Sequence, residues 1–186
     1  MNGESALDIH APVAWPAIIA GAVASVATAF VLIAIGTGFD LALGSPWPGG
    51  RLSGEGFNPM AGAGLVAVQS LAAALGGYLA GRLRPHWAGV HGHEVHFRDT
   101  AHGFLAWALS VVAGVVLAAV WVAAAGRPAE MAIGDDPLRA AHLASQASLF
   151  MGIGLLMAAF VASVAGAIGG LRRDEMRLRG PAAQNL

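Results

Sequence analysis

Four long apolar stretches constrain this chain more than any other feature of its sequence. They cover residues 13–43, 59–82, 99–125 and 137–171, and each exceeds the roughly 20 apolar residues that a helix needs to cross a membrane. Only 11% of the residues are charged, against about a quarter in soluble domains, so too few charges remain to cover a water-exposed surface. The sequence therefore predicts an all-α polytopic membrane protein, a single domain over residues 1–186 built as a four-helix transmembrane bundle.

Arginines are distributed unequally between the two ends of this predicted bundle. With four spans, both termini and the middle connection share one side of the membrane. That side carries Arg82, Arg84, Arg98, Arg172, Arg173, Arg177 and Arg179, whereas the other side carries Arg51, Arg127 and Arg139. Because arginine-rich connections tend to remain in the cytoplasm, we expect both termini, a histidine-rich loop at 84–98 and a tail at 172–186 to be cytoplasmic.

Glycines recur at helical spacing in the second and fourth stretches. Gly77 and Gly81 form one GxxxG pair, and Gly166 and Gly170 form another. Such pairs let two helix backbones approach closely in lipid, so we expect these faces to pack within the bundle, between copies of the chain, or both. Gln69 is costly to expose to lipid and should face another helix. The similar ends of the two stretches also suggest a parallel 2+2 repeat.

Function classes are narrowed mainly by what the spans lack. No Asp, Glu, Lys, Arg or His lies near the centre of any predicted span, which argues against a pump or an ion-coupled transporter. The chain contains no Cys and has a net charge of −1, so it offers no thiolate site and implies no nucleic-acid partner. The sequence contains no recognisable enzyme motif, which favours a non-enzymatic role without deciding it, and no cofactor is predicted apart from a possible divalent metal.

A polar cluster is predicted where the third span begins. If the helix begins before Asp99, then Glu94, Arg98 and His102 share one stripe, because they lie at i, i+4 and i+8. Alternatively, Asp99 or Thr100 caps the first turn of the helix. In both cases we expect a network at the membrane surface that is formed by Glu94, Arg98, Asp99 and His102. Arg98 would be at its centre and would bind the carboxylates of Glu94 and Asp99.

A metal site is the competing interpretation of the same loop. His91, His93 and His96 would supply imidazole ligands, with Glu94 or His102 completing the set. Imidazole and carboxylate groups suit a divalent metal such as zinc. The sequence contains no familiar metalloprotease motif, because the spacing between His93 and His96 is one residue too short for it.

Three segments resemble a known group of proteins. They are WPAIIAGA at 15–22, GGYLAGR at 76–82 and EVHFRDTAHGFLAW at 94–107. Together they resemble small bacterial integral membrane proteins that are often labelled PhnA-like. The resemblance implies a four-span fold and location in the bacterial inner membrane, and it implies no particular activity.

The leading hypothesis is a small non-enzymatic membrane protein that packs through its glycine faces. It would act as a scaffold or accessory subunit, either as a homo-oligomer or within a larger membrane complex, with the lipid bilayer as its constant partner. The alternative is a channel or transporter, for instance for a metal ion, that uses the histidine-rich loop. A membrane redox or enzyme component is the third possibility.

Overall fold

The computed structural model describes residues 13–43, 59–85, 92–124 and 137–179, and the regular structure in these ranges is entirely helical. The helices are α1 (Trp15–Leu43), α2 (Pro59–Leu83), α3 (Gly92–Ala124) and α4 (Pro137–Arg179). Each contains a segment long and apolar enough to cross a membrane. The predicted fold class, an all-α four-helix membrane bundle, is confirmed.

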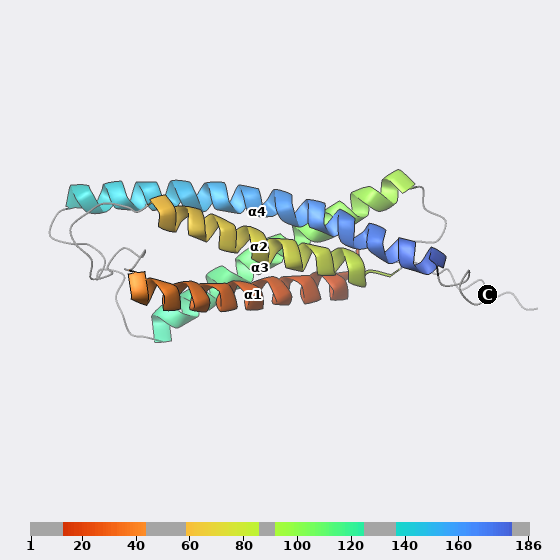
Figure 1. Ribbon diagram of the computed structural model, residues 1–186, viewed down its shortest axis with the longest axis horizontal. Coiled ribbons are helices and arrows are strands. Elements are labelled where there is room, and N and C mark those ends of the chain that lie inside the picture. The colour runs from red at the N-terminus through yellow and green to blue at the C-terminus, as the bar shows by residue number, and fades with distance from the viewer. Residues whose placement is uncertain (1–12, 44–58, 86–91, 125–136, 180–186) are drawn as a thin grey trace, which may run out of the picture.

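The helices alternate in direction along the chain. The start of α1, the end of α2, the start of α3 and the end of α4 lie together at one end of the molecule, at the right of Figure 1. Consequently α2 and α4 run parallel to each other. Helix α2 packs against α1, α3 and α4, while α3 packs against α1 and α4 as well.

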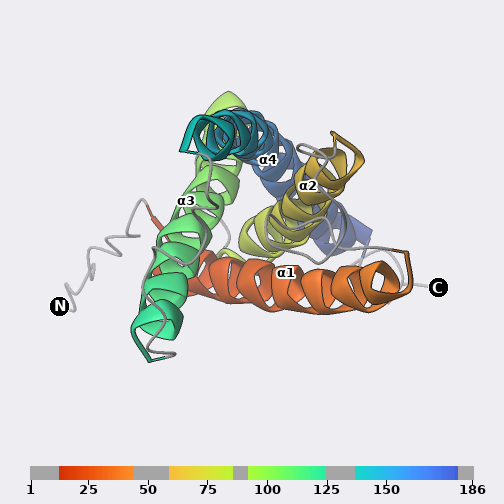
Figure 2. The ribbon, with the colours of Figure 1, turned by 90° about the vertical axis from the view of Figure 1, so that its left-hand side faces the viewer.

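The two ends of the bundle differ in packing. At the end shared by the start of α1 and the end of α2, here called the packed end, the four helices are in close contact. Toward the opposite end, the splayed end, the helices diverge, as Figure 2 shows from that side. From Val115 to Ala124, every residue of α3 is exposed. The second half of α3 therefore stands apart from the other helices, whereas α2 and α4 remain in contact further along, where Gly154 meets Val66 and Gln69.

Small residues make the close contacts at the packed end. The buried apolar residues are mostly alanines, with Ile18 the largest of them. Since lipid tails are as apolar as leucine side chains, helices in a membrane gain little from burying large apolar groups, and close backbone packing contributes more. The alanines and glycines of this chain permit that close packing.

Helices α2 and α4 meet through the predicted glycines. A Cβ atom built on Gly77 would overlap the backbone of Ala162, and one on Gly81 would overlap the backbone of Gly166. Gly103 of α3 approaches the same two α4 residues. A ridge of small residues on α4 therefore fits between α2 and α3, where any larger side chain would separate the helices.

Helix α1 joins α2 through a second small-residue contact, which involves none of the predicted packing residues. A Cβ atom on Gly21 would overlap the carbonyl oxygen of Gly76. One turn further along α1, the Ser25 hydroxyl donates a hydrogen bond of 3.0 Å to the carbonyl oxygen of Ala72. This bond satisfies a polar group that would otherwise be buried among apolar neighbours.

Two helix boundaries differ from the predicted spans. Helix α3 begins at Gly92, so half of the expected loop at 84–98 is helical and Asp99 lies inside the helix instead of capping it. Glu94 in the first turn favours this early start, because a carboxylate there stabilises the positive end of the helix. Helix α4 continues to Arg179, so the expected tail at 172–186 begins as helix.

Candidate functional site: a buried ionic cluster at the packed end

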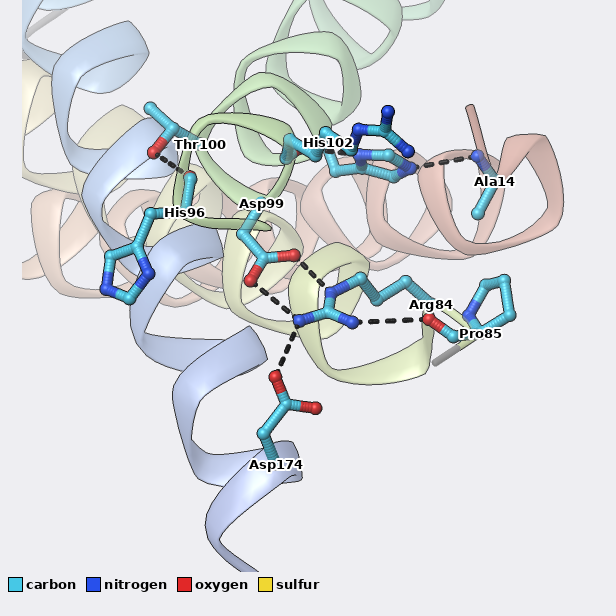
Figure 3. Close-up of polar contacts among 9 residues, drawn as sticks. Ala14, Arg84, Pro85, His96, Asp99, Thr100, His102 and Asp174 are labelled. Atoms are coloured by element: carbon cyan, nitrogen blue, oxygen red, sulfur yellow. Dashed lines mark hydrogen bonds and ion pairs between the residues drawn. The ribbon is translucent and has the colours of Figure 1, made fainter. Parts of the chain in front are cut away.

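Arg84 is at the centre of the polar cluster at the packed end. It follows the last residue of α2, and both Arg84 and Asp99 of α3 are 1% exposed. The Arg84 Nε donates to Oδ1 of Asp99, and Nη2 donates to Oδ2 of the same carboxylate at 2.9 Å. The same Nη2 reaches Oδ2 of Asp174 on α4, also at 2.9 Å, while Nη1 donates to the Pro85 carbonyl at 3.2 Å (Figure 3).

This geometry makes one guanidinium the connection between three helices. A side-on, two-bond contact between arginine and carboxylate is among the strongest hydrogen-bonded pairings in proteins. The Asp99 side chain is 2% exposed and that of Asp174 is 34% exposed, so the bond to Asp99 lies in the drier environment. If either Arg84 or Asp99 lost its partner, the remaining buried charge would lower the stability of the folded protein considerably.

Gly170 provides the space that the Asp99 carboxylate occupies. A Cβ atom built on Gly170 would overlap that carboxylate, and one on Gly166 would come within 2.6 Å of the Asp99 carbonyl oxygen. The glycine spacing on α4 therefore serves two purposes. It brings the helix backbones together, and it makes room for the acidic side chain that binds Arg84.

His102 links α3 to Ala14, the residue directly before α1. Its Nε2 accepts a 2.9 Å hydrogen bond from the backbone N–H of Ala14, and its Nδ1 lies 2.6 Å from the carbonyl oxygen of Arg98. A carbonyl oxygen only accepts, so Nδ1 carries the proton. Nε2 must then be unprotonated in order to accept. These two contacts require a neutral imidazole, which satisfies an N–H group at the start of α1 that has no acceptor within the helix.

The predicted centre of the network was Arg98, but in the structure that position belongs to Arg84. The Arg98 Nε donates to Oε1 of Glu94 at 2.7 Å, one turn earlier on α3, and the two side chains are 25% and 49% exposed. Neighbouring helical residues point about 100° apart, so Asp99 faces the bundle while Arg98 faces outward. The four predicted residues therefore divide between an exposed ion pair and buried contacts to other helices.

The predicted metal ligands lie on the outside of α3 or beyond the described residues. His93 and His96 are exposed, and His91 lies outside the described residues. Within the part of the chain that the structure describes, no group of three His, Cys, Asp or Glu side chains is placed to hold a metal ion. The described residues at the exposed start of α3 include a carboxylate, an arginine and two histidines, but their side chains do not converge on one point where a metal ion could bind.

Gln69 faces α4, beside a glycine. Its Nε2 lies 3.1 Å from the Met151 sulfur, and a Cβ atom on Gly154 would overlap its Oε1. In the described part of the chain this buried Oε1 has no hydrogen-bond partner. Gly154 therefore accommodates the amide at the α2–α4 interface.

Arg84 is the main participant that lies outside the predicted network. Its separation from Asp99 is only 15 residues and from Asp174 is 90 residues, and neither partner lies on its own helix. One feature of the sequence could have indicated Arg84. A carboxylate at the start of an apolar helix needs a cation, and the end of α2 lies next to the start of α3 in a four-helix bundle.

The chain was compared with known proteins, and it matches no protein-family model, no curated protein and no solved structure.

Proposed function

We propose that this protein is a non-enzymatic membrane scaffold or accessory subunit, which assembles with copies of itself or within a larger membrane complex. The observation that carries the proposal is the contrast between the two ends of the bundle. One end is closed by glycine contacts and a buried ionic cluster, whereas the second half of α3 leaves its apolar side chains exposed, among them Val116, Val120 and Trp121.

The chemistry of the described residues supports a structural role. Arg84 and Asp99 are buried and engaged with each other, so neither is available to a substrate. The His102 side chain is also buried, and its ring bonds to two backbone groups. Groups that are held in this way rigidify the packed end, which suits a protein that presents a fixed surface to its partners.

The cytoplasmic orientation of the packed end is part of the same proposal. The arginines at 82, 84, 98, 172 and 173 all lie within or directly after helix segments at that end. Since positively charged residues are retained on the cytoplasmic side, the packed end would face the cytoplasm. The resemblance to PhnA-like membrane proteins supports the same location, the bacterial inner membrane.

Single-cysteine cross-linking in native membranes tests the proposal. The chain has no cysteine, so each variant reports on one position. Val120→Cys places a thiol on the exposed half of α3, and Ile19→Cys places one near the packed end. Both positions are exposed, Val120 at 60% and Ile19 at 50%. We expect covalent dimers, or an adduct with a co-purifying subunit, from Val120→Cys and much less from Ile19→Cys.

The measurement is gel mobility after mild oxidation or after treatment with a bifunctional thiol reagent, followed by the mass of the complex in mild detergent. A protein that remains monomeric, with no co-purifying subunit and equal cross-linking at both positions, would contradict the scaffold proposal. It would show that lipid alone covers the splayed end.

A further inference from the structure

The outer face of the α2–α4 pair carries arginines that the ionic cluster does not use. Helices α1 and α3 contact α2 through other sides, since Gly76 and Ala80 face α1 while Arg84 faces α3. Gly77 and Gly81 face α4. Tyr78 and Arg82 each follow one residue after these two glycines, about 100° further around the helix, and so they lie on the face away from α1.

Arg172 lies on the same outer face, on α4. Gly169 touches the backbone of Tyr78 and Arg82, and two turns later Met176 touches the Arg82 guanidinium through its sulfur, 3.6 Å from Nη2. Arg172 is three residues after Gly169 and four before Met176, so the three share one side of α4. Because Gly170 points toward Asp99 of α3, Arg172 flanks α2 on the side away from α3.

Arg82 and Arg172 differ in their partners from the two arginines whose ion pairs are described above. Arg84 and Arg98 bind carboxylates. Within the described ranges, no ion pair joins Arg82 or Arg172 to an acidic side chain, including the nearby Glu175. The Arg82 guanidinium instead lies over the ring of Tyr78, 5.9 Å from its centroid. That contact positions the side chain and leaves most of its N–H donors available.

An apolar surface continues from the arginines toward the middle of the bundle. On α2 the residues one, two and three turns before Arg82 on this face are Tyr78, Leu75 and Leu71, and the two leucines are 43% and 60% exposed. On α4 the corresponding residues before Arg172 are Ile168, Ala165 and Val161. Both series follow the same i, i+4, i+7, i+11 spacing, and the two helices run parallel, so on each helix the arginine follows the apolar residues toward the packed end.

We propose that this outer face binds one anionic phospholipid, with its phosphate between Arg82 and Arg172 and its acyl chains along Leu71, Leu75 and Ile168. Charge complementarity carries the proposal, because Arg82 and Arg172 have no carboxylate partner among the described residues and lie at one end of an apolar surface. Arginine suits the role, since its planar fork matches phosphate oxygens. The inference goes beyond the scaffold role and does not depend on it.

Lipid titration into the full-length protein in detergent tests this site. Native mass spectrometry would give the dissociation constant for one phosphatidylglycerol molecule, with phosphatidylcholine as the zwitterionic reference. We expect the wild type to prefer phosphatidylglycerol. Arg82→Gln or Arg172→Gln should weaken binding about fivefold, and the double Gln variant about 30-fold, given about 1 kcal/mol for each arginine near an anionic lipid.

Two controls make the result specific. Arg127→Gln removes the same charge from the segment that joins α3 to α4 and should leave the dissociation constant unchanged. Replacing both site arginines by Lys keeps the positive charge but removes the planar guanidinium group. The affinity of this variant for the lipid should lie between those of the wild type and the double Gln variant. Unaltered binding in the double Gln variant, an equal loss in Arg127→Gln, or displacement of the lipid by inorganic phosphate at the lipid's own concentration would overturn the proposal.

Discussion

Replacing Arg84 by Met tests whether the buried ionic cluster holds the packed end together. The substitution keeps the apolar length of the side chain and removes the only cation shown bonded to Asp99, whose side chain is 2% exposed. Removing one partner of a buried ion pair typically costs about 3–5 kcal/mol, because the remaining charge stays in a dry place. The exposed pair between Glu94 and Arg98 provides the comparison, since such pairs contribute about 1 kcal/mol or less.

We therefore expect Arg84→Met to lower the free energy of unfolding by several times as much as Arg98→Met. Proteins are stable by about 5–15 kcal/mol in total, so the first variant should be visibly compromised and the second nearly normal. Helix content of the full-length protein would be followed by circular dichroism while denaturing detergent is titrated into mild micelles. The two midpoints and slopes then give the difference in free energy.

A double variant separates the lost pair from other effects of the substitution. Arg84→Met combined with Asp99→Leu removes both buried charges and should recover most of the lost stability, because an apolar pair often replaces a buried ion pair without loss. If Arg84→Met were no more damaging than Arg98→Met, the Arg84–Asp99 contact would contribute little. If the double variant did not recover, repacking around Asp99 would explain the loss better than its charge.

Three further predictions address the packing, the histidine contact and the topology. Gly81→Ala should lower the unfolding free energy by about 1–3 kcal/mol through overpacking, whereas the control Gly114→Ala should be neutral or stabilising by up to about 1 kcal/mol, because a Cβ at Gly114 would meet nothing within 4 Å. Equal effects of the two substitutions would show that α2 and α4 do not touch at Gly81. His102→Leu should lower the unfolding free energy by about 1–3 kcal/mol because it leaves the buried N–H of Ala14, just before α1, without an acceptor. The same detergent titration measures this effect, and an unchanged midpoint would refute that bond. A reporter fused after Leu186 and another inserted at Gly89 should both be active in the cytoplasm, and a periplasmic signal from either would contradict the proposed orientation.

The number and class of the helices could be predicted because they depend on local composition. A stretch of about 20 apolar residues in lipid must satisfy its backbone hydrogen bonds internally, and a helix does this with its own residues. The spacing of Gly77 and Gly81 likewise indicated a face suited to close packing. None of these inferences requires knowledge of which helix lies next to which.

The helix boundaries at the packed end were harder to predict because apolar composition does not mark them. The polar turns from Gly92 to Arg98 have no apolar periodicity, yet they are helical. An ion pair one turn apart, Glu94 with Arg98, stabilises such a segment locally. The sequence offered this arrangement as one of two alternatives, and only the structure distinguished it from a cap at Asp99.

The partners within the ionic cluster were decided by the tertiary structure alone. Asp99 has Arg98 beside it in the chain, but helix geometry turns these two side chains apart and directs Asp99 toward the end of α2. The partner of His102 is a backbone N–H 88 residues away, which no local pattern reveals. Sequence therefore determined that this chain forms apolar helices with small-residue faces and arginines at one end. Which charge is buried, and against which helix, depended on how those faces fit together, because a buried pairing requires both partners at one depth and on facing sides.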